Sequence, residues 1–109
     1  YPQFSTTTTG SSFKEWDDQA TYHSFTILTF KIESYEADPL FIQAHVDLIV
    51  PLYQQAQAYG SPRILFSAHS LPQKVIDAGD PYQYQTEQTV KEIVKLLEAK
   101  VEGKVDHRL

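Results

Sequence analysis

Apolar residues recur at helical spacing in three stretches of the chain, which predicts three helices. The first is expected from about Ser12 to Tyr22, the second from Asp38-Pro39 to Gly60, and the third from Tyr84 to Val101. The third has the clearest pattern, because apolar side chains line one of its faces: Val90, Ile93, Val94, Leu97 and Val101. That face is predicted to lie in the core.

Polar residues and prolines mark the ends of these helices. Asp38 is a typical N-cap, and Pro39 suits the first helical position after it. Ser12 and Glu15 form the spacing of a capping box. Pro51 removes one backbone donor inside the second helix, at a cost of roughly 3 kcal/mol where packing does not offset it. A kink in that helix is therefore expected.

Other stretches have the composition of strands. Phe25 to Ile32 is rich in β-forming residues, Ile64 to Phe66 is continuously apolar as in a strand buried on both faces, and Val105 to Leu109 resembles the start of a further strand. Tyr1 to Gly10 has the pattern of a strand end that runs into a polar loop. Strands and helices would then alternate, which predicts an α/β fold with three layers and a mostly parallel sheet built from βαβ crossovers.

The apolar strand at Ile64 leads to the candidate chemistry. It ends in Ser67-Ala68 and is followed at once by His69, which is where open α/β sheets bind ligands. Pro72 prevents the strand from continuing, and a short helical turn is expected from Gln73 to Ala78. Position alone supports a functional histidine and a structural histidine equally. The later Asp80 is expected to organise a turn through bonds to backbone N–H groups.

Two blocks of the sequence resemble signatures of the ferrochelatase family, the enzymes that insert ferrous iron into protoporphyrin at the end of haem synthesis. The first is Tyr1-Pro2-Gln3-Phe4-Ser5 followed by Thr8-Thr9-Gly10-Ser11-Ser12, and the second is Ser67-Ala68-His69-Ser70-Leu71-Pro72 followed by Gly79-Asp80-Pro81-Tyr82. The similarity covers essentially the whole chain but only the middle of the family's sequence. Residues 1–109 are therefore expected to be part of one ferrochelatase-like α/β domain.

The resemblance implies a function and a set of site residues. The parent protein would insert ferrous iron, as substrate, into protoporphyrin IX and form protohaem, whereas the isolated fragment would be inactive. His69 would be catalytic and bind the metal, either by delivering iron or by accepting a pyrrole proton. Tyr35 stands where the family has an aromatic residue, often tryptophan, and can stack on a macrocycle. Ser70 and Pro72 would contact the substrate.

Composition narrows this hypothesis. The chain contains no cysteine, so it offers no thiolate to an iron–sulfur cluster and resembles the cluster-free, largely bacterial members. Its net charge of −5 disfavours a nucleic-acid partner. No apolar run approaches the roughly 20 residues of a membrane span. A cytoplasmic location is expected, and the family's range leaves a weak peripheral membrane association open.

Two other functions remain open at this point. A related chelatase would load cobalt or nickel into another tetrapyrrole with the same architecture and a site histidine. A non-catalytic α/β module would bind a ligand without using His69 chemically. The paired signatures favour the iron enzyme over both.

The remaining polar features are expected to be structural. The threonine-rich run before Gly10 could bind an anion at a helix start, but it lacks the spaced glycines and lysine of a nucleotide-binding loop. A solvated loop is the preferred interpretation. His45 is expected to be a partly exposed helix histidine, and His23 and His107 are expected to lie on the surface.

Overall fold

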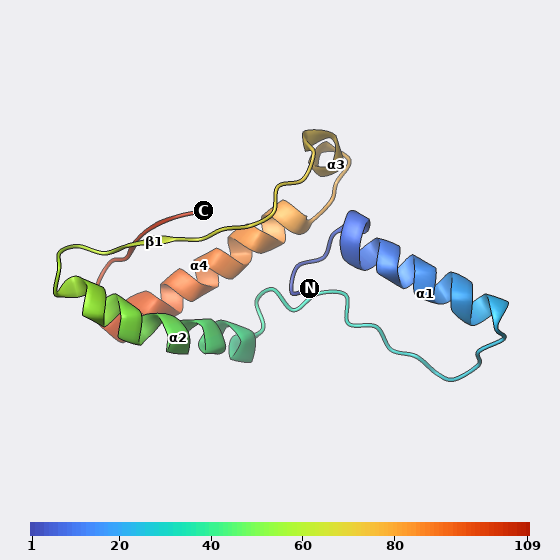
Figure 1. The fold of residues 1–109 in the computed structure, drawn as a ribbon, viewed down its shortest axis with the longest axis horizontal. Coiled ribbons are helices and arrows are strands. Elements are labelled where there is room, and N and C mark those ends of the chain that lie inside the picture. Colours follow the sequence, from blue (N-terminus) through green and yellow to red (C-terminus); the bar gives the residue numbers. More distant parts are fainter.

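The computed structural model describes all residues from 1 to 109. Its elements are the π-helix η1 (Thr6–Gly10), the helices α1 (Ser11–Tyr22) and α2 (Pro39–Gln57), the strand β1 (Arg63–Leu65), the helices α3 (Gln73–Asp77) and α4 (Tyr82–Val101), and the strand β2 (Asp106–Arg108) (Figure 1). All three predicted long helices are present. The predicted turn after Pro72 is also confirmed, since it forms α3.

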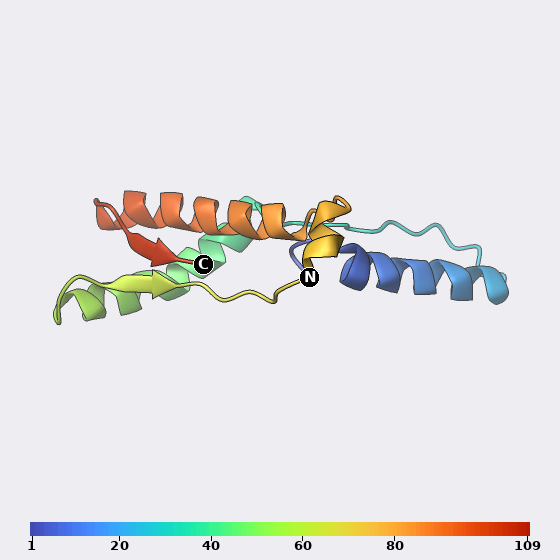
Figure 2. The same cartoon turned by 90° about the horizontal axis from the view of Figure 1, so that it is seen from above.

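The core lies where α2 packs against α4, and both helices run toward the same end of the molecule (Figures 1 and 2). The buried apolar residues come mainly from these helices: Ile42, Val46, Tyr53, Val90, Ile93, Val94, Leu97 and Val105. The predicted α4 stripe is confirmed, except that Val101 is only partly buried. Full burial of such a side chain stabilises the fold by about 1.5–3 kcal/mol.

The sheet consists of two short parallel strands, β1 and β2. Ile64 faces His107 across the ladder, and the pairing continues through a bond from the Phe66 N–H to the Arg108 carbonyl at 2.8 Å. The expectation that this apolar run is buried on both faces is wrong. Ile64 packs against the core, but the Leu65 side chain is 76% exposed because nothing covers the other face.

The strand predicted from Phe25 to Ile32 does not form. These residues have no strand pairing, and Ile27, Leu28 and Phe30 are exposed. No strand forms before Thr6 either. A β-forming sequence becomes a strand only where another backbone pairs with it over several residues. Phe25 to Ile32 has no such neighbour, and residues 1–5 make only one backbone bond of this kind, from the Tyr35 N–H to the Pro2 carbonyl. The fold described is therefore a set of helices with a small parallel sheet, and the predicted alternation over three layers is not seen.

The two predictions about helix starts have different outcomes. Asp38 caps α2 as expected, because its Oδ1 accepts bonds from the N–H groups of Leu40 and Phe41 at 2.9 and 3.1 Å. The capping box at Ser12 is wrong, since η1 runs directly into α1 and leaves no free helix start there. The helical path continues through Pro51, which lies within α2.

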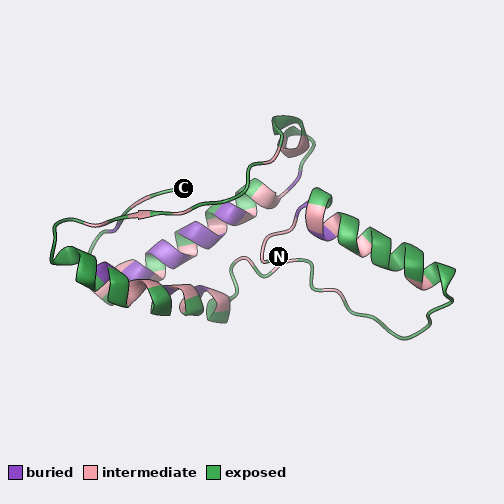
Figure 3. Cartoon of the chain, in the orientation of Figure 1, coloured by how far each residue is buried: buried purple, intermediate pink, exposed green.

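The chain is elongated, with a Cα radius of gyration of 18.1 Å against about 13 Å for a compact domain of this length. We call α2, β1, α4 and β2 the body and residues 1–35 the arm, which projects to one side (Figures 1 and 2). Buried residues concentrate on the facing sides of α2 and α4, while α1 has none (Figure 3). No helix of this chain combines the length and the hydropathy of a membrane-spanning segment.

Candidate active site

His69 lies in the extended segment between β1 and α3, where its side chain is exposed and makes no hydrogen bond to the rest of the chain. It lines two cavities. The α3 cavity, of about 520 Å³, lies between the His69 segment, α3 and the start of α4. The N-terminal cavity, of about 350 Å³, lies between the His69 segment, residues 1–3 and the body. The two α4 residues Tyr82 and Thr86 line both.

The predicted residue Tyr35 lies one layer behind the N-terminal cavity. Its N–H donates to the carbonyl of Pro2 at 2.8 Å, and its ring meets that of Phe41 edge-on at a centroid distance of 5.4 Å. Pro2 and Phe41 both line the N-terminal cavity together with His69. Tyr35 therefore contacts two residues that line this cavity but does not line the cavity itself.

Ser70 and Pro72 are placed differently from each other. Ser70 lines the α3 cavity beside His69. Pro72 lines neither of the His69 cavities and occupies the N-cap position of α3. Of the predicted site residues, Ser70 is thus next to His69 in a cavity wall, while Pro72 shapes the turn that follows.

Asp80 is the most extensively bonded side chain near this site. Its Oδ1 accepts from the Tyr82 N–H at 3.0 Å, which confirms the predicted turn. Its Oδ2 accepts from the Thr6 N–H and Thr6 Oγ1 at 2.7 Å each and from Ser5 Oγ at 3.0 Å. Burial raises the pKa of Asp80, but the bonds from Thr6, Tyr82 and Ser5 outweigh burial and hold that pKa below its usual range.

These bonds decide between the two interpretations of the Ser/Thr loop. The loop does bind an anion, and the anion is the carboxylate of Asp80 from the same chain. Ser5 is fully buried and also accepts from the Thr7 N–H, so it caps η1. The expectation of a solvated loop is therefore wrong: Thr6–Gly10 forms η1, and Ser5 and Thr9 are buried, although Thr6 and Thr7 are exposed.

Two further contacts attach the N-terminal residues to α4. The Phe4 N–H donates to Gln85 Oε1 at 2.6 Å, and Gln3 Nε2 donates to Thr89 Oγ1 at 2.8 Å. Thr89 Oγ1 in turn donates to the Glu36 carbonyl at 2.8 Å. Helical periodicity did not predict these roles. The only available signal was that polar Gln85 and Thr89 continue the buried side of α4 beyond its apolar residues.

His45 lies nearer to the candidate site than its position in a helix predicted. It is half-buried, as predicted, but it lines the N-terminal cavity with His69. Its Nδ1 lies 3.0 Å from the Phe41 carbonyl, and the two rings meet edge-on at a centroid distance of 4.5 Å. No group of three or more His, Asp or Glu side chains is arranged to hold a metal ion.

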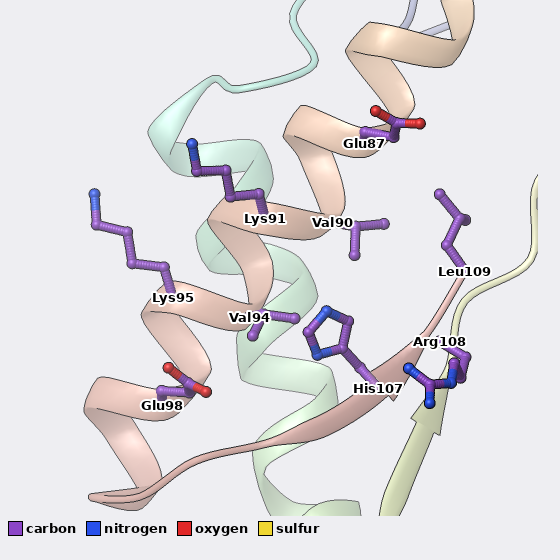
Figure 4. Close-up of a pocket in the computed structure, with 9 residues that line it drawn as sticks. All are labelled: Glu87, Val90, Lys91, Val94, Lys95, Glu98, His107, Arg108 and Leu109. Atoms are coloured by element: carbon purple, nitrogen blue, oxygen red, sulfur yellow. The ribbon is translucent and has the colours of Figure 1, made fainter.

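A third cavity, larger than the two beside His69, lies between α4 and β2 (Figure 4). It measures about 660 Å³, and His107 points into it beside Val90 and Val94. His107 is therefore half-buried, which corrects the expected surface position, whereas His23 is exposed as predicted. At the end of this cavity a bond from the Val105 N–H lowers the pKa of Glu98 against the effect of burial, and Lys104 adds to the lowering.

Comparison with known proteins gives one consistent result. The family model described as Ferrochelatase matches residues 1–107. A ferrochelatase of Wolbachia from Brugia malayi is 49% identical over 100 residues, which cover 92% of this chain and 29% of that protein. The ferrochelatases of Caulobacter vibrioides and Pelagibacter ubique are 44% and 43% identical, over 96% and 89% of this chain and 29% and 27% of their own. The chain thus spans less than a third of these relatives.

Proposed function

The chain belongs to the ferrochelatase family, and from this premise we propose that the protein containing it inserts ferrous iron into protoporphyrin IX. The product is protohaem, and the reaction is the last step of haem biosynthesis. The similarity to ferrochelatases from several bacteria supports the iron enzyme. It does not favour the cobalt or nickel chelatase or the non-catalytic binding module.

His69 is the residue on which the chemistry depends in this proposal. Metal insertion requires two pyrrole protons to leave the porphyrin and the incoming ion to lose ligands. A neutral imidazole can bind ferrous iron or accept a proton near neutral pH. The observation that carries the assignment is that His69 lines two cavities while its ring has no hydrogen-bond partner in the chain. Its nitrogens are therefore available to a substrate.

The other predicted residues would form the porphyrin's surroundings. Ser70 would contact the substrate from the α3 cavity wall, and Pro72 would fix the course of the segment that carries it. Tyr35 would stack on the macrocycle, since the residue is 42% exposed and its side chain is not enclosed by the rest of the chain. A planar porphyrin hides its nitrogen lone pairs, and bending it costs on the order of 1–5 kcal/mol, which contacts of this kind would offset.

In the full-length protein, further residues would complete the α/β domain of which this chain forms a part. We propose that further strands extend β1 and β2 into the three-layer α/β domain and that residues 1–109 alone do not catalyse the reaction. The absence of cysteine from this stretch supports a cluster-free member of the family. A weak membrane association, which the resemblance left open, has no support from the structure.

The test is iron insertion by the full-length protein with and without His69→Ala. Removing a general base or metal ligand should lower kcat by about 100-fold or more while the fold is retained. His23→Ala is the matched control, because His23 is exposed at the end of α1 and should leave activity unchanged. Full activity of His69→Ala would remove His69 from the mechanism, and an inactive wild type would contradict the proposed reaction.

A further inference from the structure

We propose that Asp80 is a positioning residue, whose single carboxylate fixes two walls of the N-terminal cavity relative to each other. The inference rests on the proposed function, because the N-terminal cavity is one of the two cavities that His69 lines and from which it would meet the porphyrin. Asp80 itself lines neither His69 cavity. It would act on the reaction only through the segments that it holds.

Each oxygen of the carboxylate holds a different segment. Oδ1 binds the N–H of Tyr82, the residue whose side chain lines both cavities beside His69. Oδ2 binds Ser5 and Thr6, which follow, after a gap of one residue, another part of the N-terminal cavity wall, Tyr1 to Gln3. A shift of Asp80 would therefore change the separation of the two walls.

The arrangement requires an ionised carboxylate in particular. Three donors converge on Oδ2, and an ionised carboxylate accepts such bonds with charge-assisted strength. An amide offers one carbonyl oxygen and two donors, so asparagine cannot satisfy Oδ1 and Oδ2 partners together. Asp80 is 8% exposed, and its lowered pKa keeps it charged at neutral pH. Replacement by asparagine should release one of the two segments at nearly constant volume.

The folded state depends less on the bonds of Asp80 than the geometry of the cavity does. The apolar core between α2 and α4 does not include Asp80. Phe4 and Gln3 also keep their own bonds to Gln85 and Thr89 on α4. The loss of Asp80 should therefore leave the N-terminal residues attached at Gln3 and Phe4 and the body folded, but the cavity wall should be held less rigidly. Binding of the porphyrin should suffer before the chemical step does.

The experiment compares Asp80→Asn with Asp77→Asn in the full-length protein. Asp77 is exposed and binds only Gln73 within α3, so it provides the same chemical change. Gln73 lines the α3 cavity, but neither residue lines the N-terminal cavity whose walls Asp80 holds. For Asp80→Asn we expect the KM for protoporphyrin to rise about tenfold, with kcat within about twofold of wild type. Amide hydrogen exchange at Thr6 should become faster. Asp77→Asn should change none of these quantities.

A second variant separates positioning from a loss of folding. Thr6→Val keeps the carboxylate and removes one donor, and it should raise KM by a smaller factor that does not multiply with that of Asp80→Asn. If Asp80→Asn does not fold, Thr6→Val alone decides: a raised KM supports the inference and an unchanged KM overturns it. A folded Asp80→Asn protein with unchanged KM also overturns it. An inactive wild type would instead overturn the proposed function.

Discussion

The body and the arm of this chain are held in place by different interactions. In the body, α2 and α4 bury a continuous set of apolar side chains together with Val105, just before β2, and Ile64 of β1 packs against that core. The arm has no buried apolar residue, and its attachment consists largely of hydrogen bonds from residues 3–6 to Asp80, Gln85 and Thr89. The body should therefore respond to changes of volume and the arm to changes of charge and hydrogen bonding.

The largest expected effect is in the body. Leu97 is fully buried between the helices, so Leu97→Ala should destabilise the 109-residue chain by about 2–5 kcal/mol through lost burial and the cavity left behind. Leu48→Ala makes the same change at a side chain that is 73% exposed on α2, and it should cost less than about 0.5 kcal/mol. Urea denaturation measures both. Equal losses of unfolding free energy would contradict the buried position of Leu97 and the exposed position of Leu48.

Acid should weaken the attachment of the arm. The folded-state pKa of Asp80 is lowered, so its stabilising contribution is complete above the ordinary carboxyl pKa of about 3.9 and is lost as the pH falls through the lower folded value. The amide signals of Thr6 and Tyr82 should shift together over that range in an NMR titration. In Asp80→Asn this shared transition should be absent. Separate transitions at the two amides would contradict their attachment to one carboxylate.

A smaller effect should distinguish two threonines on α4. Thr89 Oγ1 bonds Gln3 and Glu36, so Thr89→Val should destabilise the chain by about 1–3 kcal/mol and weaken the arm's attachment. Thr86 Oγ1 is buried without a partner, so Thr86→Val should be neutral or stabilising by up to about 1 kcal/mol. Thermal unfolding of both variants gives the comparison. A destabilising Thr86→Val would show that its hydroxyl has a partner in solution.

The same contrast explains what could be predicted from the sequence. The helices were predictable because their signals are local: the α4 stripe repeats every three to four residues, and Asp38-Pro39 marks the start of α2 by itself. The absence of a strand at Phe25 was not predictable, because a strand needs a pairing partner that the local sequence does not specify. Likewise, the sequence placed His69 after β1 and Asp80 in a turn. The bonds from Asp80 to Ser5 and Thr6 join residues about 75 positions apart, for which no local pattern exists.

The smallest expected change in stability concerns the segment from Phe25 to Ile32, where the predicted strand does not form. Phe30 is 85% exposed and belongs to an apolar, β-forming segment without a pairing partner, which is the kind of segment that associates with other chains. Phe30→Lys should change the free energy of unfolding by less than about 0.5 kcal/mol, because the side chain packs on nothing. It should nevertheless reduce self-association of the 109-residue chain, measured by sedimentation across a range of concentrations. Tyr59→Lys is the matched control, since Tyr59 is 94% exposed but lies outside this segment. If both variants reduce association equally, overall charge rather than the unpaired segment controls it, and the arm's exposed residues would then have no special role.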